Sequence, residues 1–185
     1  VNGSIMATGA TFTDDSFIGG DIVTCTVTPD DGFSTGTPES ASITIENTSP
    51  TVTDVDISPD DAYTDDTLSC AHVFDDVDLD LDVSTFEWRV SITETGAGQV
   101  QGTDATLDSS NFLRDHWVTC TVTSNDGTID GTSDSDQIQI LNTAPVVSAA
   151  SVLPSDPIAS TASLACDYTF SDADGDSDSS TIEWY

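Results

Sequence analysis

The sequence predicts an all-β protein made of short antiparallel strands, and three observations support this prediction. The chain is rich in Thr, Ser, Val and Ile and poor in Leu, Glu and Lys, which favours strands over helices. Short alternating segments are separated by Asp-, Gly- and Pro-containing turns. Long segments of the first half also return in the second half. The 185 residues allow one large or two ordinary domains.

Three pairs of matching segments define an internal repeat. They are Asp21–Gly32 with His116–Gly127, Ile43–Pro50 with Ile138–Pro145, and Leu68–Trp88 with Leu164–Trp184. The cysteines give the period, because Cys25 and Cys120 are 95 residues apart and Cys70 and Cys166 are 96 apart. A period of this size equals one small β-sandwich domain.

One complete repeat unit contains predicted strands at regular spacing. Leu68, Cys70 and His72 alternate, so that they share one face of their strand. Weaker strands are expected between Gln99 and Leu107. The other predicted strands are Thr51–Ile57, Thr67–Phe74, Thr85–Ile92, Trp117–Thr123 and Asp136–Leu141.

The order Cys70, Trp88, Cys120 resembles that of immunoglobulin-like domains, in which a buried Trp packs against a disulfide between the second and sixth strands. Trp88 follows Cys70 by 18 residues, and Trp184 follows Cys166 by the same number. The unit is similar to the immunoglobulin-like, cadherin-like or PKD-like repeats of giant secreted bacterial or archaeal surface proteins, adhesins included. This resemblance covers the whole chain. It implies tandem Greek-key β-sandwiches arranged end to end, with both Trp residues in cores.

The resemblance also implies one disulfide per domain. Cys70 pairs with Cys120 inside the complete unit, whereas Cys25 and Cys166 each lack a partner there and are expected to pair across the repeat boundary. A zinc site is the alternative for these cysteines, but the chain has no CxxC pair and its two histidines lack ligand spacing. Disulfides indicate an oxidising setting, outside the cell or on its surface.

The domain boundaries follow from the repeat. Residues 1–46 are expected to be the C-terminal part of one domain, 47–142 a complete domain, and 143–185 the N-terminal part of a further domain. Joining the last residues, STIEWY, to the first, VNGSI, restores the strand that carries Trp88. We expect a continuous chain in which this pair of domains repeats. Separate subunits that complete each other head to tail are the alternative.

The charge of the chain excludes several partners. Its formal net charge is −32, its only basic residues besides two histidines are two arginines, and 29 of its 34 acids are aspartates. Such a chain repels nucleic acid and anionic membranes and attracts cations. No run of 18 apolar residues predicts a transmembrane helix, so direct membrane insertion is not expected.

Alternating aspartates predict Ca²⁺ sites in the loop after the second strand of each copy. Carboxylates at every second residue can point several oxygens at one centre, as hard cations require. A solvated acidic turn is the alternative, but four like charges so close together repel one another unless a cation intervenes. The predicted ligands are Asp76, Asp78, Asp80 and Asp82 in one copy and Asp172, Asp174, Asp176 and Asp178 in the other.

Further ligands are expected where consecutive domains meet. In a sandwich, the loop after the second strand, the loop after the sixth strand and the incoming linker share one end. Ca²⁺ at such a junction would stiffen it, as in cadherins. The added candidates are Asp30, Asp31, Asn125 and Asp126 in the loops after the sixth strand, and Glu46, Asn47 and Asn142 in the linkers.

The function predicted from these features is structural. The chain carries no GxSxG, HExxH or Gly-rich phosphate loop, and we expect no enzyme. We expect a segment of an extracellular filament or stalk whose partners are copies of itself. The alternative is an adhesin module for glycans or cell surfaces, with Trp117 and Phe33 as candidate contacts. The pattern NxS/T marks Asn2 and Asn47 as candidate glycosylation positions.

Overall fold

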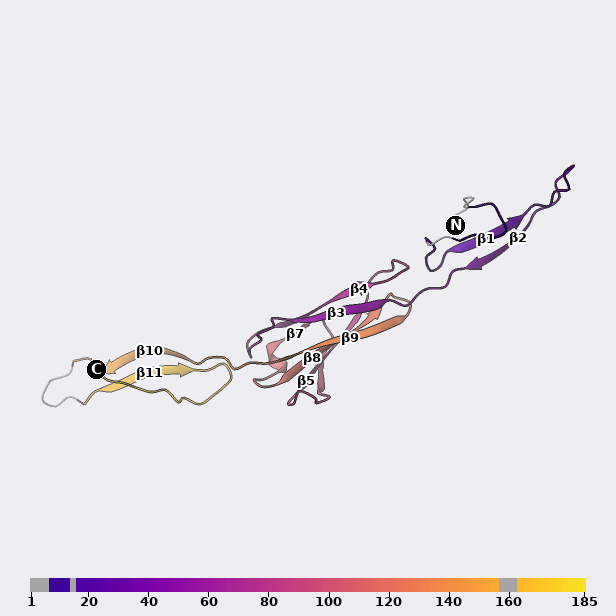
Figure 1. Ribbon diagram of the computed structural model, residues 1–185. Helices are drawn as coiled ribbons and strands as arrows, with labels where there is room; N and C mark the ends of the chain where they lie inside the picture. Colours follow the sequence, from indigo (N-terminus) through magenta and orange to yellow (C-terminus); the bar gives the residue numbers. More distant parts are fainter. Residues whose placement is uncertain (1–6, 14–15, 157–162) are drawn as a thin grey trace. The chain divides into compact units, whose positions relative to one another are not determined.

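The computed structural model describes residues 7–13, 16–156 and 163–185, and this part of the chain is all β apart from one short 3-10 helix (Figure 1). The all-β prediction is confirmed. Asp, Gly and Pro in the connections keep the strands short. The elements are β1 (Ile22–Val27), β2 (Glu39–Thr44), β3 (Thr51–Ser58), β4 (Leu68–Asp75), β5 (Thr85–Ser91), β6 (Gln99–Gly102), β7 (Thr106–Leu107), η1 (Ser109–Asn111), β8 (Trp117–Asn125), β9 (Asp130–Gln139), β10 (Val146–Leu153) and β11 (Ala165–Ser171).

The described strands form four sheets. β1–β2 and β10–β11 are two-stranded antiparallel sheets, and the larger sheets have the orders β3-β4-β7 and β6-β5-β8-β9. A disulfide between Cys70 on β4 and Cys120 on β8 joins the two larger sheets. The predicted pairing of these two cysteines is therefore confirmed.

The last strand of the repeat unit begins earlier than its hydrophobic pattern indicates. We expected a strand from Asp136, but β9 begins at Asp130. Residues 130–135 carry no apolar side chain, and the strand there is held by pairing with β8 and by a hydrogen bond of 2.8 Å between the hydroxyls of Thr123 and Ser133. Backbone pairing extends a strand without any apolar signal in the sequence.

The chain divides into two compact units, each described by itself. The first comprises Val1–Asp54, His72–Thr85 and Val122–Asp134, and the second comprises Val55–Ala71, Phe86–Thr121 and Ser135–Tyr185. The expected division at residues 46 and 142 remains a prediction.

The second unit contains most of the apolar core. Trp88 is fully buried, and its indole Nε1 donates a hydrogen bond of 2.8 Å to the backbone carbonyl of Asp104. Leu68, Val118 and Cys120 are also fully buried. A buried indole needs a partner for its N–H group, and the Asp104 carbonyl supplies it.

The first unit is held by close backbone approach and by polar groups. Ser124 is fully buried, and its hydroxyl donates to the carbonyl of Pro50 at 3.1 Å. A Cβ added at Gly131 would lie 1.7 Å from the same carbonyl oxygen, so only glycine fits at that point of β9. The linker residue Pro50 is thereby fixed against β8 and β9. All described buried polar or charged residues belong to this unit: Asp76, Asp78, Ser124 and Asp126.

The repeat extends to the backbone conformation. Asp54 in β3 has φ +53°, and Ala149, 95 residues later in β10, has φ +55°. The pairing of β10 with β11 shifts register between Ser148 and Ser151, around Ala149. A non-glycine residue rarely adopts this conformation, so β10 repeats an uncommon feature of β3.

Replacing both Cys70 and Cys120 by Ala is expected to lower the free energy of unfolding by about 3–4 kcal/mol. The bond links residues 50 positions apart and restricts the unfolded chain accordingly. Equilibrium urea denaturation measures the change. Cys25→Ala is the matched control, since Cys25 is exposed and unpaired, and should change stability by less than about 0.5 kcal/mol. A double variant as stable as the parent would contradict the assignment.

Candidate metal centre

Asp76 shapes the first acidic loop by accepting backbone N–H groups from the residues that follow it. Its Oδ1 accepts from the N–H of Asp78 at 2.7 Å and from that of Asp80 at 3.4 Å. Leu79 completes the turn with a positive φ of 64°. As a result, one oxygen from each of Asp76, Asp78 and Asp80 lies within 4.8 Å of the others. We call these three residues the first Asp triad.

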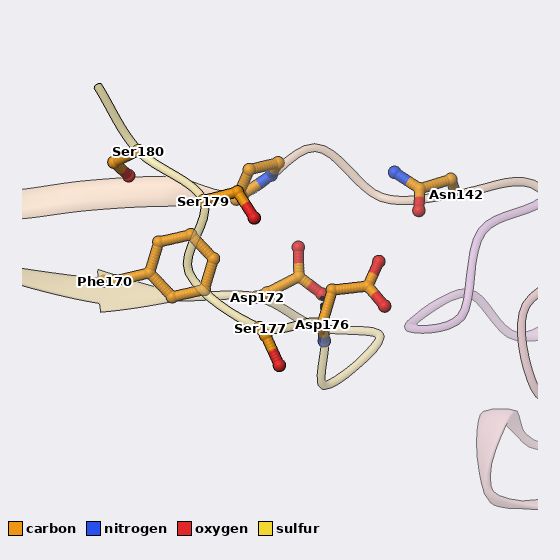
Figure 2. A pocket seen from close by; sticks show the side chains of 8 residues that line it. Asn142, Phe170, Asp172, Asp176, Ser177, Ser179 and Ser180 are labelled. Atoms are coloured by element: carbon orange, nitrogen blue, oxygen red, sulfur yellow. Dashed lines mark hydrogen bonds between the residues drawn. The ribbon is translucent and has the colours of Figure 1, made fainter.

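The second acidic loop has the same construction. Asp172 Oδ1 accepts from the N–H groups of Asp174 and Asp176 at 2.9 and 3.1 Å. Gly175, with φ +78°, takes the place of Leu79. Oxygens of Asp172, Asp174 and Asp176 lie within 4.8 Å of one another and form the second Asp triad. Figure 2 shows Asp172 and Asp176 together, with Asn142 on the linker nearby.

The middle aspartate of each triad accepts a hydrogen bond from a linker residue. One linker precedes β3 and the other precedes β10. Asp78 accepts from the N–H of Thr48 at 2.5 Å and from the N–H of Gly19 at 2.6 Å. Asp174 accepts from the N–H of Thr143 at 2.6 Å and from the hydroxyl of Thr64 at 2.5 Å. Both linkers are therefore attached to their acidic loops by the same backbone contact.

The loop after β8 contacts the linker that is bound to the first triad. Asn47 Nδ2 donates to Asp126 Oδ2 at 2.7 Å, and Asp126 Oδ1 accepts from the N–H groups of Thr128 and Ile129. The expected convergence of linker, acidic loop and following loop therefore occurs inside the first unit. The hydrogen bond from Asn47 is the main cause that lowers the pKa of Asp126 below its usual value.

Two of the three aspartates of the first triad are buried, whereas Asp80 is exposed. Asp76 is 8% exposed and Asp78 is 6% exposed, and Asp76 Oδ2 has no hydrogen-bond partner among the described residues. Desolvation, followed by the charges of Asp76, Asp126 and Asp78, raises the pKa of Asp80. The N–H of Thr48 lowers the pKa of Asp78. A buried carboxylate oxygen without a donor is costly unless a cation lies beside it.

The positively charged side chain of Arg114 contacts the second triad. Arg114 Nη1 donates to Asp176 Oδ2 and also to Asn142 Oδ1, the latter at 2.8 Å. The hydrogen bond and charge of Asp176 raise the pKa of Arg114. By the repeat, Gly19 stands 95 residues earlier in the place of Arg114. The two triads therefore differ in the charge beside them. Arg114 was not among the site residues predicted from the sequence, although it is one of only two arginines in a chain without lysine.

A small recess adjoins the second triad. It has a volume of about 300 Å³ and lies between the linker and the loop after β11 (Figure 2). Phe170 contributes its ring, and the other lining groups are small or polar. The residues that line it are Asn142, Pro145, Phe170, Asp172, Asp176, Ser177, Ser179 and Ser180.

Asp82 and Asp178, which were also expected as ligands, are engaged elsewhere. Each accepts from the backbone N–H two residues later at 2.8 Å, at Ser84 and Ser180 respectively. The second oxygen of Asp82 contacts His72 Nε2 at 2.9 Å, and that of Asp178 accepts from the Tyr168 hydroxyl at 2.8 Å. These two aspartates shape the end of each loop rather than joining the triads.

The remaining predicted ligands lie in turns or exposed positions. Asp30 and Asp31 accept backbone N–H groups from the residues that follow them, as Asn125 does from Gly127 at 2.7 Å. Glu46 is exposed. Their coordination of a metal remains a prediction. Asn2, a candidate glycosylation position, lies outside the described residues.

The two cysteines outside the disulfide are both unpaired. Cys25 is exposed on β1 and Cys166 is half-buried on β11. Trp184, expected in a core, is 54% exposed, whereas its counterpart Trp88 is fully buried. The predicted pairing across the repeat boundary remains a prediction.

Comparison with protein-family models, curated proteins and solved structures finds no match to this chain. Within the described ranges, no helix has the length and apolar character needed to cross a membrane.

Leu79→Gly is expected to raise the free energy of unfolding by up to about 1 kcal/mol. The left-handed conformation costs an L-residue roughly 1–2 kcal/mol, more than the roughly 0.5–1 kcal/mol of extra backbone entropy that glycine loses. Leu81→Gly is the matched control, because both side chains are 82% exposed and Leu81 has no positive φ. It should lower stability by about 0.5–1 kcal/mol. Urea denaturation measures both changes in the free energy of unfolding. Equal changes would contradict the proposal that the positive φ of Leu79 is strained.

Proposed function

We propose that this chain is a segment of an extracellular filament or stalk, built from tandem immunoglobulin-like, disulfide-bonded β-sandwiches whose junctions bind Ca²⁺. The observation that carries the proposal is the repeated junction. The linker N–H groups of Thr48 and Thr143 bind Asp78 and Asp174 in the same way, 95–96 residues apart in the sequence. A repeated module whose linkers are attached to its own loops suits a one-dimensional assembly.

The donors of the first triad suit a hard cation. Asp76, Asp78 and Asp80 offer carboxylate oxygens within 4.8 Å of one another, and Asp126 contributes a further negative charge. Ca²⁺ takes six to eight oxygen ligands in flexible geometry, whereas Mg²⁺ requires a near-ideal octahedron. A loop of carboxylates in an irregular turn favours Ca²⁺. Its charge would offset the mutual repulsion of these carboxylates and would give Asp76 Oδ2 a partner.

Calcium bound at this place would stiffen the junction. Asp78 joins the linker to the acidic loop, and Asn47 joins the linker to the loop after β8. A cation beside these groups would hold three segments of the first unit together. The Cys70–Cys120 disulfide agrees with an oxidising, extracellular location.

Calcium removal tests the proposal. Addition of Ca²⁺ at one hundred times its dissociation constant is expected to raise the free energy of unfolding by about 2.7 kcal/mol per site, and excess EDTA should reverse the gain. Thermal unfolding followed by circular dichroism measures both. A midpoint that neither Ca²⁺ nor EDTA changes would overturn the proposed cation sites.

Asp80→Asn separates cation binding from general charge effects. Without Ca²⁺, the variant should unfold at a higher temperature than the parent, because one of the mutually repelling carboxylates is neutralised. With Ca²⁺ it should unfold at a lower temperature, since a ligand is lost. Asp60→Asn changes the net charge equally at an exposed position outside the triads and should show no such reversal.

Arg114→Gly is expected to raise the Ca²⁺ affinity of the second triad. The guanidinium binds Asp176 and repels a second cation, while the first triad has Gly19 in the equivalent place. Isothermal titration calorimetry should show a weaker class of sites in the parent that becomes tighter in the variant. Arg89→Gly is the matched control, because Arg89 pairs with Glu87 and not with either triad. An unchanged Ca²⁺ affinity in the Arg114 variant would show that the guanidinium does not compete with Ca²⁺ for the second triad.

An adhesin module is the second candidate function. Phe33 is 98% exposed in the loop after β1, where the other copy has Thr128. An exposed aromatic ring that differs between repeats suits contact with a glycan. Binding of the chain to a glycan array, lost on Phe33→Thr, would favour this candidate over the structural one.

A further inference from the structure

The β1–β2 sheet exposes apolar positions whose counterparts are buried on β8 and half-buried on β9. Val122 is fully buried, but Val27, 95 residues earlier and of the same residue type, is 62% exposed. Ile43 on β2 is 67% exposed, whereas its counterpart Ile138 on β9 is half-buried. Cys25 is exposed, whereas its counterpart Cys120 is fully buried in a disulfide. The face that β8 and β9 bury is therefore repeated on β1 and β2 and is open there.

The β10–β11 sheet has the complementary exposed face. Its counterpart in sequence is β3–β4, where Val52, Ile57 and Leu68 are 4% exposed or less. The corresponding residues of the second copy are all 45–50% exposed: Val147, Val152 and Leu164. The two open sheets thus repeat both sides of an interface that already exists between the larger sheets, and the Cys70–Cys120 disulfide crosses that interface.

From these two faces we infer that the β1–β2 sheet of one copy docks on the β10–β11 sheet of a second copy of this sequence, with a disulfide from Cys25 to Cys166. The occupant is a second copy because the chain itself contains an interface with the same pattern of apolar residues and cysteines. Exposed apolar patches on a protein surface often mark sites of association.

The β10–β11 sheet has a recess at the position where the second copy would dock. A recess of about 250 Å³ opens beside Cys166 and is lined by Val147, Tyr168 and Ile182 among others. The residue that corresponds to Cys166 is Cys70, which is bonded to Cys120. Gly36 on the incoming copy stands in the place of Gly131, whose missing side chain lets β9 approach the Pro50 carbonyl.

The docked copy would also complete the second Asp triad, a point that rests on the proposed function. Asp126 adds its charge to the first triad from the loop after β8. Its counterpart Asp31 has the same turn, accepting from the N–H groups of Phe33 and Ser34 at 2.9 and 2.8 Å. Docking would bring Asp31 of one copy to the second triad of the other and make that site a shared one.

The covalent step is a thiol–disulfide exchange with a low-molecular-weight disulfide such as oxidised glutathione. One cysteine thiolate attacks the glutathione disulfide, forms a mixed disulfide and releases one reduced glutathione. The other thiolate attacks the mixed disulfide, forms the Cys25–Cys166 bond and releases the second reduced glutathione. The two cysteines lose two electrons, and the glutathione disulfide gains them.

The experiment mixes two single variants of the full 185-residue chain, Cys25→Ser and Cys166→Ser. Each variant keeps one of the two cysteines, so each offers only one face for covalent capture. In a glutathione redox buffer with Ca²⁺, non-reducing electrophoresis should show a ladder of multimers for the parent, monomers for each variant alone, and dimers only for the mixture. Peptide mass spectrometry should identify the Cys25–Cys166 bond in that dimer.

Other patterns would overturn the docking. They are monomers in the mixture, disulfide dimers of either variant alone at the same rate, or a parent that only closes its own Cys25–Cys166 bond. Val27→Ser should slow dimer formation severalfold. Val73→Ser, on a β4 side chain that is 53% exposed, should not.

Two further measurements separate this inference from the proposed calcium sites. EDTA or Asp31→Asn should slow dimer formation without changing which cysteines pair. If dimers form equally fast under both conditions, docking stands and the shared cation site is overturned. If Ca²⁺ stabilises the chain but the mixture stays monomeric, the first triad stands and docking is overturned.

Discussion

The carboxylate of Asp78 is the contact on which the first junction depends. It accepts N–H groups from Thr48, 30 residues away, and from Gly19, 59 residues away, so a single side chain joins three segments of the first unit. Asp174 repeats the contact to Thr143 in the second unit. Because carboxylates accept backbone N–H groups strongly, a loop of aspartates can position a linker without any apolar packing.

The same aspartates repel one another, and the surroundings of the two triads differ in how far they offset this repulsion. In the first triad, Asp76 is buried with an oxygen that has no donor among the described residues, and neighbouring charges add to the desolvation that raises the pKa of Asp80. In the second, Arg114 donates to Asp176 and supplies positive charge from the protein itself. Two loops with the same aspartate spacing thus differ in burial and in the positive charge beside them. A repeated motif in a sequence therefore need not mean repeated chemistry.

Much of the site was predictable because its parts are local. Alternate aspartates around a tight turn direct their oxygens to one side, so the triads followed from sequence spacing alone. Asp82 and Asp178 continue the alternation, yet they bind His72 and Tyr168 instead. Alternation alone does not indicate where the loop straightens, because that depends on which side chains of the preceding strand lie within reach.

The sequence by itself determined the strands, the repeat, the acidic loops and the Cys–Trp–Cys order, because these depend on residue type and on spacing along one chain. Only the tertiary structure decided which copies of a residue are buried. Val122 and Val27 have the same local sequence, but one is fully buried and the other is 62% exposed. Burial depends on whether an opposing sheet covers the residue. Only the three-dimensional structure shows that cover, because no local pattern encodes it.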